Sequence, residues 1–390
     1  MQARSPTTSL AVAALGCLGL ASAMGIGRFA FTPMLPLMQQ AYAMPLQQGS
    51  WLASANYVGY LIGALLCFAL DLHPGTAARL GLGVVALTTF AMGLTDWFAA
   101  WMLLRALAGI ASAFALVGMA SWALSVLVRE RRAHWAGWIF FGIGSGIVLA
   151  GAVGLVAGAT NAQPAHTWLL FGAIATAIFA LAWKPLSDDD ATPVKAAAAT
   201  RATGRIDSNA WTLIGCYGVY GFGYILPATF LPALGRQLLP DPLVFGWAWP
   251  AFGAAAALST LIAANFKRVP PRRLVAFGTL LTAAGVAAPA ISPGLVSILL
   301  SALLVGGSFV VVTMAAFQDA RLIAGGNAPR VVAAMTAAFA LGQLIGPLTV
   351  PAGAIDHALT VPSLAASALL IVAALVLLRS PAQRLIPAVD

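Results

Sequence analysis

Two arginines lie inside long apolar stretches of this 390-residue sequence. Arg28 interrupts the segment Met-Gly-Ile-Gly-Arg-Phe-Ala-Phe-Thr-Pro-Met-Leu-Pro at residues 24–36, and Arg105 interrupts the apolar run 98–127. An arginine at the centre of a membrane-spanning helix costs about 2.5–3.5 kcal/mol on insertion scales, so each side chain should face water, carbonyl groups or an anion. Because a guanidinium group pairs well with the oxygens of a carboxylate or phosphate, both residues predict contact with an anionic ligand.

Structural roles for the two arginines remain open as alternatives to contact with an anionic ligand. Arg28 could instead cap helix carbonyl groups that a break near Pro33 leaves without partners. Arg105 could hold neighbouring helices together or take part in switching between conformations. The acidic residues supply no partner for either arginine, because all eleven fall in predicted loops, tails or span ends.

Three tyrosines in the second half of the chain form a second group with chemical potential. Tyr217, Tyr220 and Tyr224 are spaced i, i+3 and i+7, which places them on one face of a helix. Their phenol groups could orient a ligand while their ring faces accept its apolar body. The alternative is that these tyrosines pack between helices or lie at the lipid interface.

Further polar residues fall within apolar runs, and each could have either a binding or a structural role. Asn56 and Tyr60 are four residues apart and share a helix face. They predict either a cavity wall or hydrogen bonds between helices, and the sequence does not separate the two. Gln343 is a further candidate for the cavity.

The composition indicates what kind of scaffold must position these residues. Hydrophobic residues make up 61% of the chain and charged residues 8%, whereas a soluble domain is about 25% charged. Apolar runs long enough to cross a bilayer recur along the whole chain, so we expect a multi-pass membrane protein. We predict twelve membrane-spanning helices at residues 8–38, 50–70, 77–95, 98–127, 133–159, 165–184, 210–234, 243–266, 272–291, 293–317, 329–352 and 361–379.

The basic residues favour one orientation of these spans. If the N-terminus is cytoplasmic, seventeen of the twenty basic residues fall in cytoplasmic segments. Arg236 is then the one basic residue on the opposite side, and Arg28 and Arg105 lie within spans. This bias predicts that both termini are cytoplasmic. It also explains the net charge of +9 without a nucleic-acid partner.

The two halves of the chain resemble each other, which indicates duplication. A shift of 196 residues aligns Gly25 with Gly221, Gly27 with Gly223, Leu35 with Leu231, Pro36 with Pro232 and Trp51 with Trp247, and it aligns Arg28 with Tyr224. A shift of 200 aligns Gly142 with Gly342 and Gly146 with Gly346. We predict a six-helix half at 1–185, a cytoplasmic linker at 186–209 and a second six-helix half at 210–390, the two-repeat arrangement of major facilitator transporters.

Three motifs also carry a resemblance to a known family. Gly25-Ile-Gly-Arg-Phe-Ala-Phe-Thr-Pro33, the segment Trp51–Tyr60 and Gly342-Gln-Leu-Ile-Gly-Pro347 resemble the YbfB/YjiJ-like bacterial branch of the major facilitator superfamily. The likeness implies the twelve-helix major facilitator fold, a location in the bacterial inner membrane, and transport of a small molecule. Arg105 followed by Gly109 is similar to the superfamily's fourth-span pattern.

Glycines and prolines in these motifs are predicted to permit close helix packing and conformational change. The set comprises Gly25, Gly27, Pro33, Pro36, Gly109, Gly142, Gly146, Gly346 and Pro347. Small residues let helix backbones approach, and prolines interrupt the helical hydrogen bonds.

The predicted function is secondary transport of a small organic anion or amphipathic metabolite by alternating access around a central cavity. An efflux pump for hydrophobic or amphipathic compounds is the alternative, and a membrane-embedded sensor is a third possibility. We expect no enzyme activity, because the sequence has no nucleophile, metal or acid–base cluster. We also expect no cofactor and no required oligomer, and we expect transport to proceed without a buried carboxylate.

Overall fold

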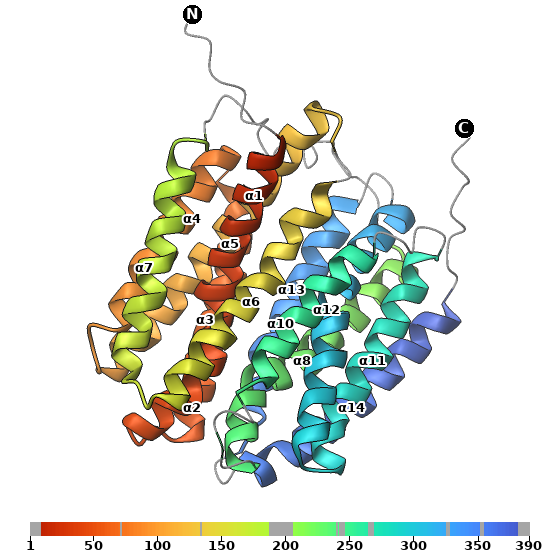
Figure 1. The fold of residues 1–390 in the computed structure, drawn as a ribbon. Coiled ribbons are helices and arrows are strands. Elements are labelled where there is room, and N and C mark those ends of the chain that lie inside the picture. Colours follow the sequence, from red (N-terminus) through yellow and green to blue (C-terminus); the bar gives the residue numbers. More distant parts are fainter. Residues whose placement is uncertain are drawn as a thin grey trace, which may run out of the picture.

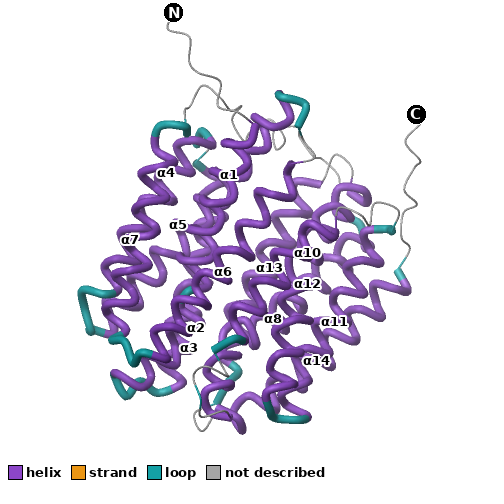
Figure 2. Tube along the Cα trace, viewed as in Figure 1, coloured by secondary structure: helices purple, strands orange, loops and turns teal. Residues whose placement is uncertain are grey.

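The computed structural model describes residues 9–70, 72–132, 135–186, 206–238, 241, 246–263, 269–324, 328–351 and 355–380. Regular structure in these ranges is entirely helical, as Figure 2 shows. Eleven helical segments of the described chain are long and apolar enough to cross a membrane, and α10 is a shorter apolar helix. The prediction of an all-helical membrane protein with twelve spans is confirmed.

The first six spans form one group of helices, shown from red to yellow-green in Figure 1. The first span is built from three consecutive segments, and five single helices follow it. The bounds are α1 Ser9–Leu20, η1 Ala21–Phe29, α2 Phe31–Ala41, α3 Leu46–Ala69, α4 Pro74–Met92, α5 Phe98–Arg129, α6 Ala136–Ala159 and α7 Pro164–Trp183.

The second group follows in the same order and lies beside the first in Figure 1. Its bounds are α8 Ser208–Leu238, α10 Ala248–Ala263, α11 Pro271–Ile291, α12 Leu295–Ala324, α13 Ala328–Leu348 and α14 Ile355–Arg379. Proline occupies the first turn of α4, α7 and α11, where its missing N–H costs no helical hydrogen bond. Most helix ends agree with the predicted spans to within a few residues.

The end of α12 differs from the prediction. We expected the tenth span to end at residue 317, but the helix continues to Ala324. Asp319, expected at a span end, therefore lies within the helix and is only 2% exposed. Its carboxylate accepts a hydrogen bond from Nε of Arg272 on α11 at 2.8 Å. Arg272 is the second residue of α11, so the pair lies at the level where that helix begins, and the arginine makes the burial of Asp319 possible. The expectation that every acidic residue lies at a loop, tail or span end stays a prediction for Asp319.

Among the described residues, three helix pairs make the most extensive contacts between the two groups: α6 with α10, α3 with α13, and α2 with α8. At the last pair, residues related by the 196-residue shift touch each other. The hydroxyl of Thr32 donates to the carbonyl oxygen of Ala228 at 2.7 Å, and Arg236 donates to the side chain of Gln40. Such contacts are expected where a two-fold pseudo-symmetry axis passes between two equivalent helices. The division at 186–209 stays a prediction, because most of that segment lies outside the described residues.

Candidate functional site

Arg28 is carried by a π-helix, η1, which spans nine residues between α1 and α2. Such wide turns are uncommon and recur at functional sites. Glycines bring the first span close to α6. A Cβ added to Gly25 of η1 would lie 2.4 Å from the backbone of Gly146, and one added to Gly142 would lie 2.1 Å from the carbonyl oxygen of Cys17 on α1. No side chain can fit between these backbones, so the first span is held tightly in place.

The corresponding contact recurs in the second group. A Cβ on Gly342 would lie 2.3 Å from the carbonyl oxygen of Gly218, and one on Gly346 would lie 2.3 Å from the side chain of Ile225. Helix α13 thus packs against α8 through the glycines that the 200-residue shift aligns with Gly142 and Gly146. The four aligned glycines share a packing role. A role in conformational change stays a prediction.

The Arg28 side chain is buried, with 3% of its surface exposed. Its Nη2 donates a hydrogen bond to Oε1 of Gln343 at 2.5 Å. Its guanidinium carbon lies 4.2 Å from the ring centre of Tyr60 and 5.2 Å from that of Tyr57. These contacts are an amide and two aromatic faces, all of them neutral. Within the described part of the chain, Nε of Arg28 has no hydrogen-bond partner.

Gln343 connects Arg28 to the tyrosines of α8. It is fully buried, and its amide nitrogen donates a hydrogen bond to the hydroxyl of Tyr224. Arg28, Gln343 and Tyr224 therefore form a continuous polar chain from η1 through α13 to α8. The chain crosses between the two groups of helices. It also brings together Arg28 and Tyr224, the pair that the 196-residue shift aligns.

The three predicted tyrosines lie in a stack of nearly parallel rings. Tyr217 and Tyr220 have ring centres 6.2 Å apart and planes inclined by 14°, while Tyr220 and Tyr224 are 5.6 Å apart and inclined by 7°. Phe309 and Phe339 extend the stack, with Phe339 4.8 Å from Tyr217. The spacing correctly predicted a shared face. The hydroxyl of Tyr220 is buried and makes no hydrogen bond within the described residues.

Arg105 and Asn56 hold the π-helix rather than extending this chain. Arg105 donates to the carbonyl oxygens of Gly27 at 3.4 Å and Arg28 at 3.3 Å, and its guanidinium lies over the ring of Phe31. The amide of Asn56 donates to the carbonyl oxygen of Arg105 at 2.9 Å and to that of Gly27 at 3.4 Å. Capping of helix carbonyls, weighed above for Arg28, is thus performed by Arg105. For Asn56 the structure shows hydrogen bonds between helices.

The remaining predicted residues border this region. A Cβ on Gly109 would lie 2.1 Å from the carbonyl oxygen of Asn56, so this glycine sets the close approach of α5 to α3. Pro36 lies inside α2, and Pro347 lies near the end of α13. Pro33 lies in the first turn of α2, and its side chain faces Gly154. A gating role for these residues stays a prediction.

Several contacts of this region involve residues that sequence reasoning did not select. The hydroxyls of Tyr57 and Thr229 lie 2.9 Å apart and join α3 to α8. Tyr57 directly follows the chosen Asn56, and its ring lies against the Arg28 guanidinium together with that of Tyr60. Phe309 and Phe339 are isolated phenylalanines in apolar helices, so no spacing distinguishes them from ordinary core residues.

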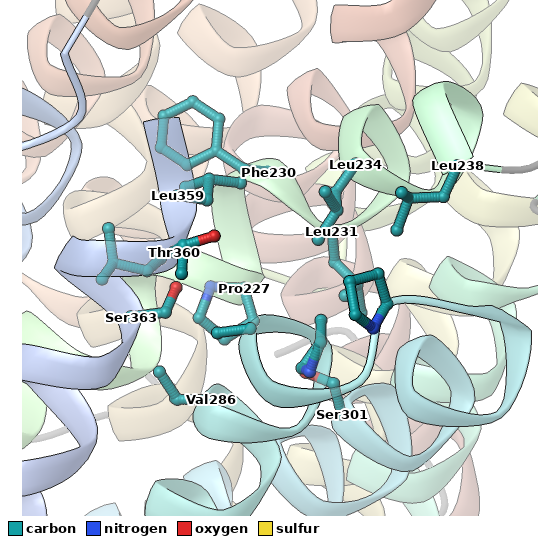
Figure 3. Close-up of a pocket in the computed structure, with 14 residues that line it drawn as sticks. Pro227, Phe230, Leu231, Leu234, Leu238, Val286, Ser301, Leu359, Thr360 and Ser363 are labelled. Atoms are coloured by element: carbon teal, nitrogen blue, oxygen red, sulfur yellow. The ribbon is translucent and has the colours of Figure 1, made fainter. Parts of the chain in front are cut away.

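A separate pocket lies within the second group, between α8, α11, α12 and α14. Figure 3 shows Pro227, Phe230, Leu231 and Ser301 among the residues around it. Its volume is about 30 Å³, which is room for one or two water molecules. None of the predicted site residues lines it, so we do not assign it to the substrate.

We expect Arg105→Lys to destabilise the folded protein. A lysine keeps the positive charge but cannot reach two carbonyl oxygens with one planar group. Losing hydrogen bonds from a charged donor costs about 1.5–3 kcal/mol. The melting temperature of the purified protein should fall by several degrees, with Arg28→Lys measured beside it as a control. An unchanged melting temperature for Arg105→Lys would show that these carbonyl contacts do not stabilise the π-helix.

Comparisons with known proteins agree with this architecture. Residues 20–378 match the model of a family described as "Uncharacterised MFS-type transporter YbfB". A relative from Bacillus subtilis (strain 168), "Uncharacterized MFS-type transporter YceJ", is 31% identical over 93 residues, which span 23% of this chain and about a quarter, 24%, of that protein.

Solved structures resemble most of the chain, including two of the same transporter. The nucleoside transporter NupG superposes with a TM-score of 0.68 and 14% identity over 95% of this chain and 98% of its own. A point mutant of NupG gives a TM-score of 0.69 and 13% identity over 93% of this chain and 99% of its own. At this level of identity the likeness concerns the fold alone.

Proposed function

The chain belongs to the YbfB family of MFS-type transporters, and we propose that it carries a small organic anion or amphipathic metabolite across the bacterial inner membrane. The substrate would bind between Arg28 on the first group of helices and Tyr224 on the second. The observation that carries this proposal is the hydrogen bond from buried Arg28 to the neutral amide of Gln343.

The charge of the substrate follows from the surroundings of Arg28. A buried guanidinium is favourable when its charge is balanced and its donors are satisfied. Its contacts here are the Gln343 amide and the faces of Tyr60, Tyr57 and Phe29, which supply no negative charge. An incoming carboxylate or phosphate would balance the charge and accept from donors that the amide oxygen leaves available.

The body of the substrate follows from the aromatic residues next to Gln343. Tyr224 packs between Tyr220 and Phe309, with ring planes inclined by 7° and 6°. Flat ring faces accept planar or apolar groups, and the phenol hydroxyls offer a polar edge. An anion with an apolar body would therefore use both sides of the site.

Substrate binding at this position could change the contacts between the two groups of helices, as alternating access requires. Gln343 and Arg28 belong to different groups of helices, so their hydrogen bond is one of the contacts between the groups in this conformation. A substrate anion that takes the place of Gln343 Oε1 would exchange this contact for its own. A ligand shifts a conformational equilibrium only through such a difference in contacts between states.

The buried carboxylate of Asp319 does not change the expectation that transport proceeds without a buried carboxylate that carries protons. Its carboxylate is paired with Arg272, and the contact ties α12 to α11 within the second group. Such a pair suits a structural role, because removing one partner leaves a buried charge uncompensated. We therefore keep the proposal that transport proceeds without a proton relay through a buried carboxylate.

Efflux of amphipathic compounds is the second candidate, and the aromatic stack is the observation that favours it. The tyrosine rings are buried in this conformation, and in one that exposed them, rings without a directional polar pattern would accept many hydrophobic molecules. In that case Arg28 would have a role in helix packing, and the charge of the transported compound would have little effect on its binding.

A thermal-shift screen of the purified protein separates the two candidates. We expect stabilisation by a small set of organic anions and little effect from matched neutral amides, because the buried cation selects charge. Nucleosides and lipophilic drugs are included as neutral planar and apolar controls. Broad stabilisation by lipophilic compounds, with no preference for anions, would contradict the proposal and favour efflux.

A further inference from the structure

A cavity of about 210 Å³ lies between the two groups of helices, away from the Arg28 chain. It is bordered by α2, α6, α8 and the first residues of α10. It lies toward the end of α2, because Pro36 follows Arg28 by eight residues, or roughly 12 Å along a helix. This is the side that the distribution of basic residues predicts to be outside the cytoplasm.

Arg236 is the cation of this cavity. It is half-buried near the end of α8, where its Nη1 donates to the carbonyl oxygen of Pro36 at 2.5 Å. Its Nη2 donates to the side chain of Gln40. Both acceptors are neutral and both belong to α2, across the boundary between the groups. The contact therefore closes the outer end of the α2–α8 interface without balancing the charge of Arg236.

The other walls combine apolar and polar surface. Pro33, Leu37, Leu155 and Trp249 supply hydrophobic side chains, Asn161 supplies an amide, and glycines of α6 leave that wall without side chains. Among the described residues that line the cavity, none is acidic. One cation and an apolar wall together suit a compact organic anion. The volume lies below the usual range for drug-sized ligands, about 300–1,000 Å³, so the ligand should be no larger than a few fused or substituted rings.

Trp249 relates this cavity to the central site. Its ring borders the cavity and also packs against Phe29, the residue after Arg28, with ring centres 6.2 Å apart. Both rings are buried, and the ring centre of Phe29 also lies 5.5 Å from the guanidinium carbon of Arg28, so the pair connects Arg28 with the cavity wall. Movement of this pair would open a path between the two positions.

We propose that the cavity between α2, α6 and α8 is a second binding station for an organic carboxylate, which Arg236 holds on its way to or from Arg28. The proposal rests on the proposed function, because it takes the transported molecule to be an anion. The repeat alignment adds to it. In the aligned pair Arg28 and Tyr224 the cation belongs to the first group of helices. In the aligned pair Gln40 and Arg236 the cation belongs to the second group. A substrate could thus pass from one cation to the other between the groups.

Cysteine protection tests the station directly. Leu155→Cys places a thiol in the cavity wall, in a protein whose Cys17, Cys67 and Cys216 are replaced by serine or alanine. Benzoate is the probe, and benzamide is its neutral control. We expect benzoate to slow labelling of the new cysteine by a methanethiosulfonate reagent by about tenfold at ten times its dissociation constant. Benzamide should have little effect.

Three further variants assign the protection to one cation. Arg236→Gln should abolish it, Arg236→Lys should retain part of it, and Arg28→Gln should leave it unchanged, each relative to its own labelling rate without benzoate. Size-exclusion chromatography confirms that each variant is folded. Protection that survives Arg236→Gln, or no protection in the parent protein, would overturn the second station. Loss of anion transport in Arg28→Gln is a separate result, so the proposed function can stand or fail independently.

Discussion

Arg28→Gln is expected to lower the uptake of an anionic substrate by about 10- to 150-fold per folded molecule. Glutamine fills part of the same space and can still bond to Gln343, but it carries no charge. Charge-assisted hydrogen bonds contribute about 1.5–3 kcal/mol, and each 1.4 kcal/mol corresponds to a factor of ten in affinity. Uptake into proteoliposomes, normalised to the amount of folded protein, measures the effect.

Two matched variants sharpen this prediction. Arg28→Lys keeps the charge but loses the planar fork, so it should retain more uptake than Arg28→Gln. Gln343→Glu should also inhibit strongly, because its carboxylate would pair with Arg28 and occupy the place of the substrate anion. If Arg28→Gln lowers only the yield of folded protein, and each molecule still transports normally, Arg28 has a structural role instead.

Gly25→Ala should have the second large effect. A Cβ at this position would lie 2.4 Å from the backbone of Gly146, and a backbone cannot turn aside as a flexible side chain can. Overpacking usually costs about 1–3 kcal/mol, and here the π-helix that carries Arg28 would have to move away from α6. We expect both a lower melting temperature and reduced uptake.

Gly215→Ala is the matched control, because a Cβ on Gly215 would meet nothing within 4 Å among the described residues. Alanine favours helix over glycine by about 1 kcal/mol, so this variant should be as stable as the parent or slightly more stable. If Gly25→Ala behaved like Gly215→Ala, the first span would not depend on its close contact with α6.

Much of the fold could be predicted because membrane spans follow from composition and length. The predicted spans correspond to the observed helices. The orientation that the basic residues favour stays a prediction. The end of α12 could not be predicted, since an aspartate usually marks the end of an apolar run. Asp319 is instead buried with Arg272, a residue 47 positions away whose contact no local pattern reveals.

The candidate site was only partly predictable. Arg28 and Arg105 look alike in sequence, each a lone cation in an apolar span. Their contacts differ because the π-helix leaves carbonyl groups that Arg105 reaches, while Arg28 points toward the second group of helices. Gln343 lies 315 residues from Arg28 and 119 from Tyr224, so only the packed structure shows that it connects them.

The repeat alignment proved the most informative feature for interpreting the interface between the groups. It pairs Thr32 with Ala228 and Gln40 with Arg236, and both pairs are in direct contact. It also pairs Arg28 with Tyr224, which meet through Gln343. Equivalent positions on two duplicated helices thus face each other, and the residues that differ between them create the chemistry of the interface.

Charge selection by Arg28 is the central claim, and the ratio of carboxylate to amide transport tests it most directly. The organic anion that stabilises the protein most in the thermal-shift screen, and its neutral amide, are supplied separately to proteoliposomes containing the parent protein or Arg28→Gln. We predict that the parent protein strongly prefers the carboxylate and that this preference falls at least about tenfold in Arg28→Gln. An equal preference in both proteins would contradict the proposed role of Arg28.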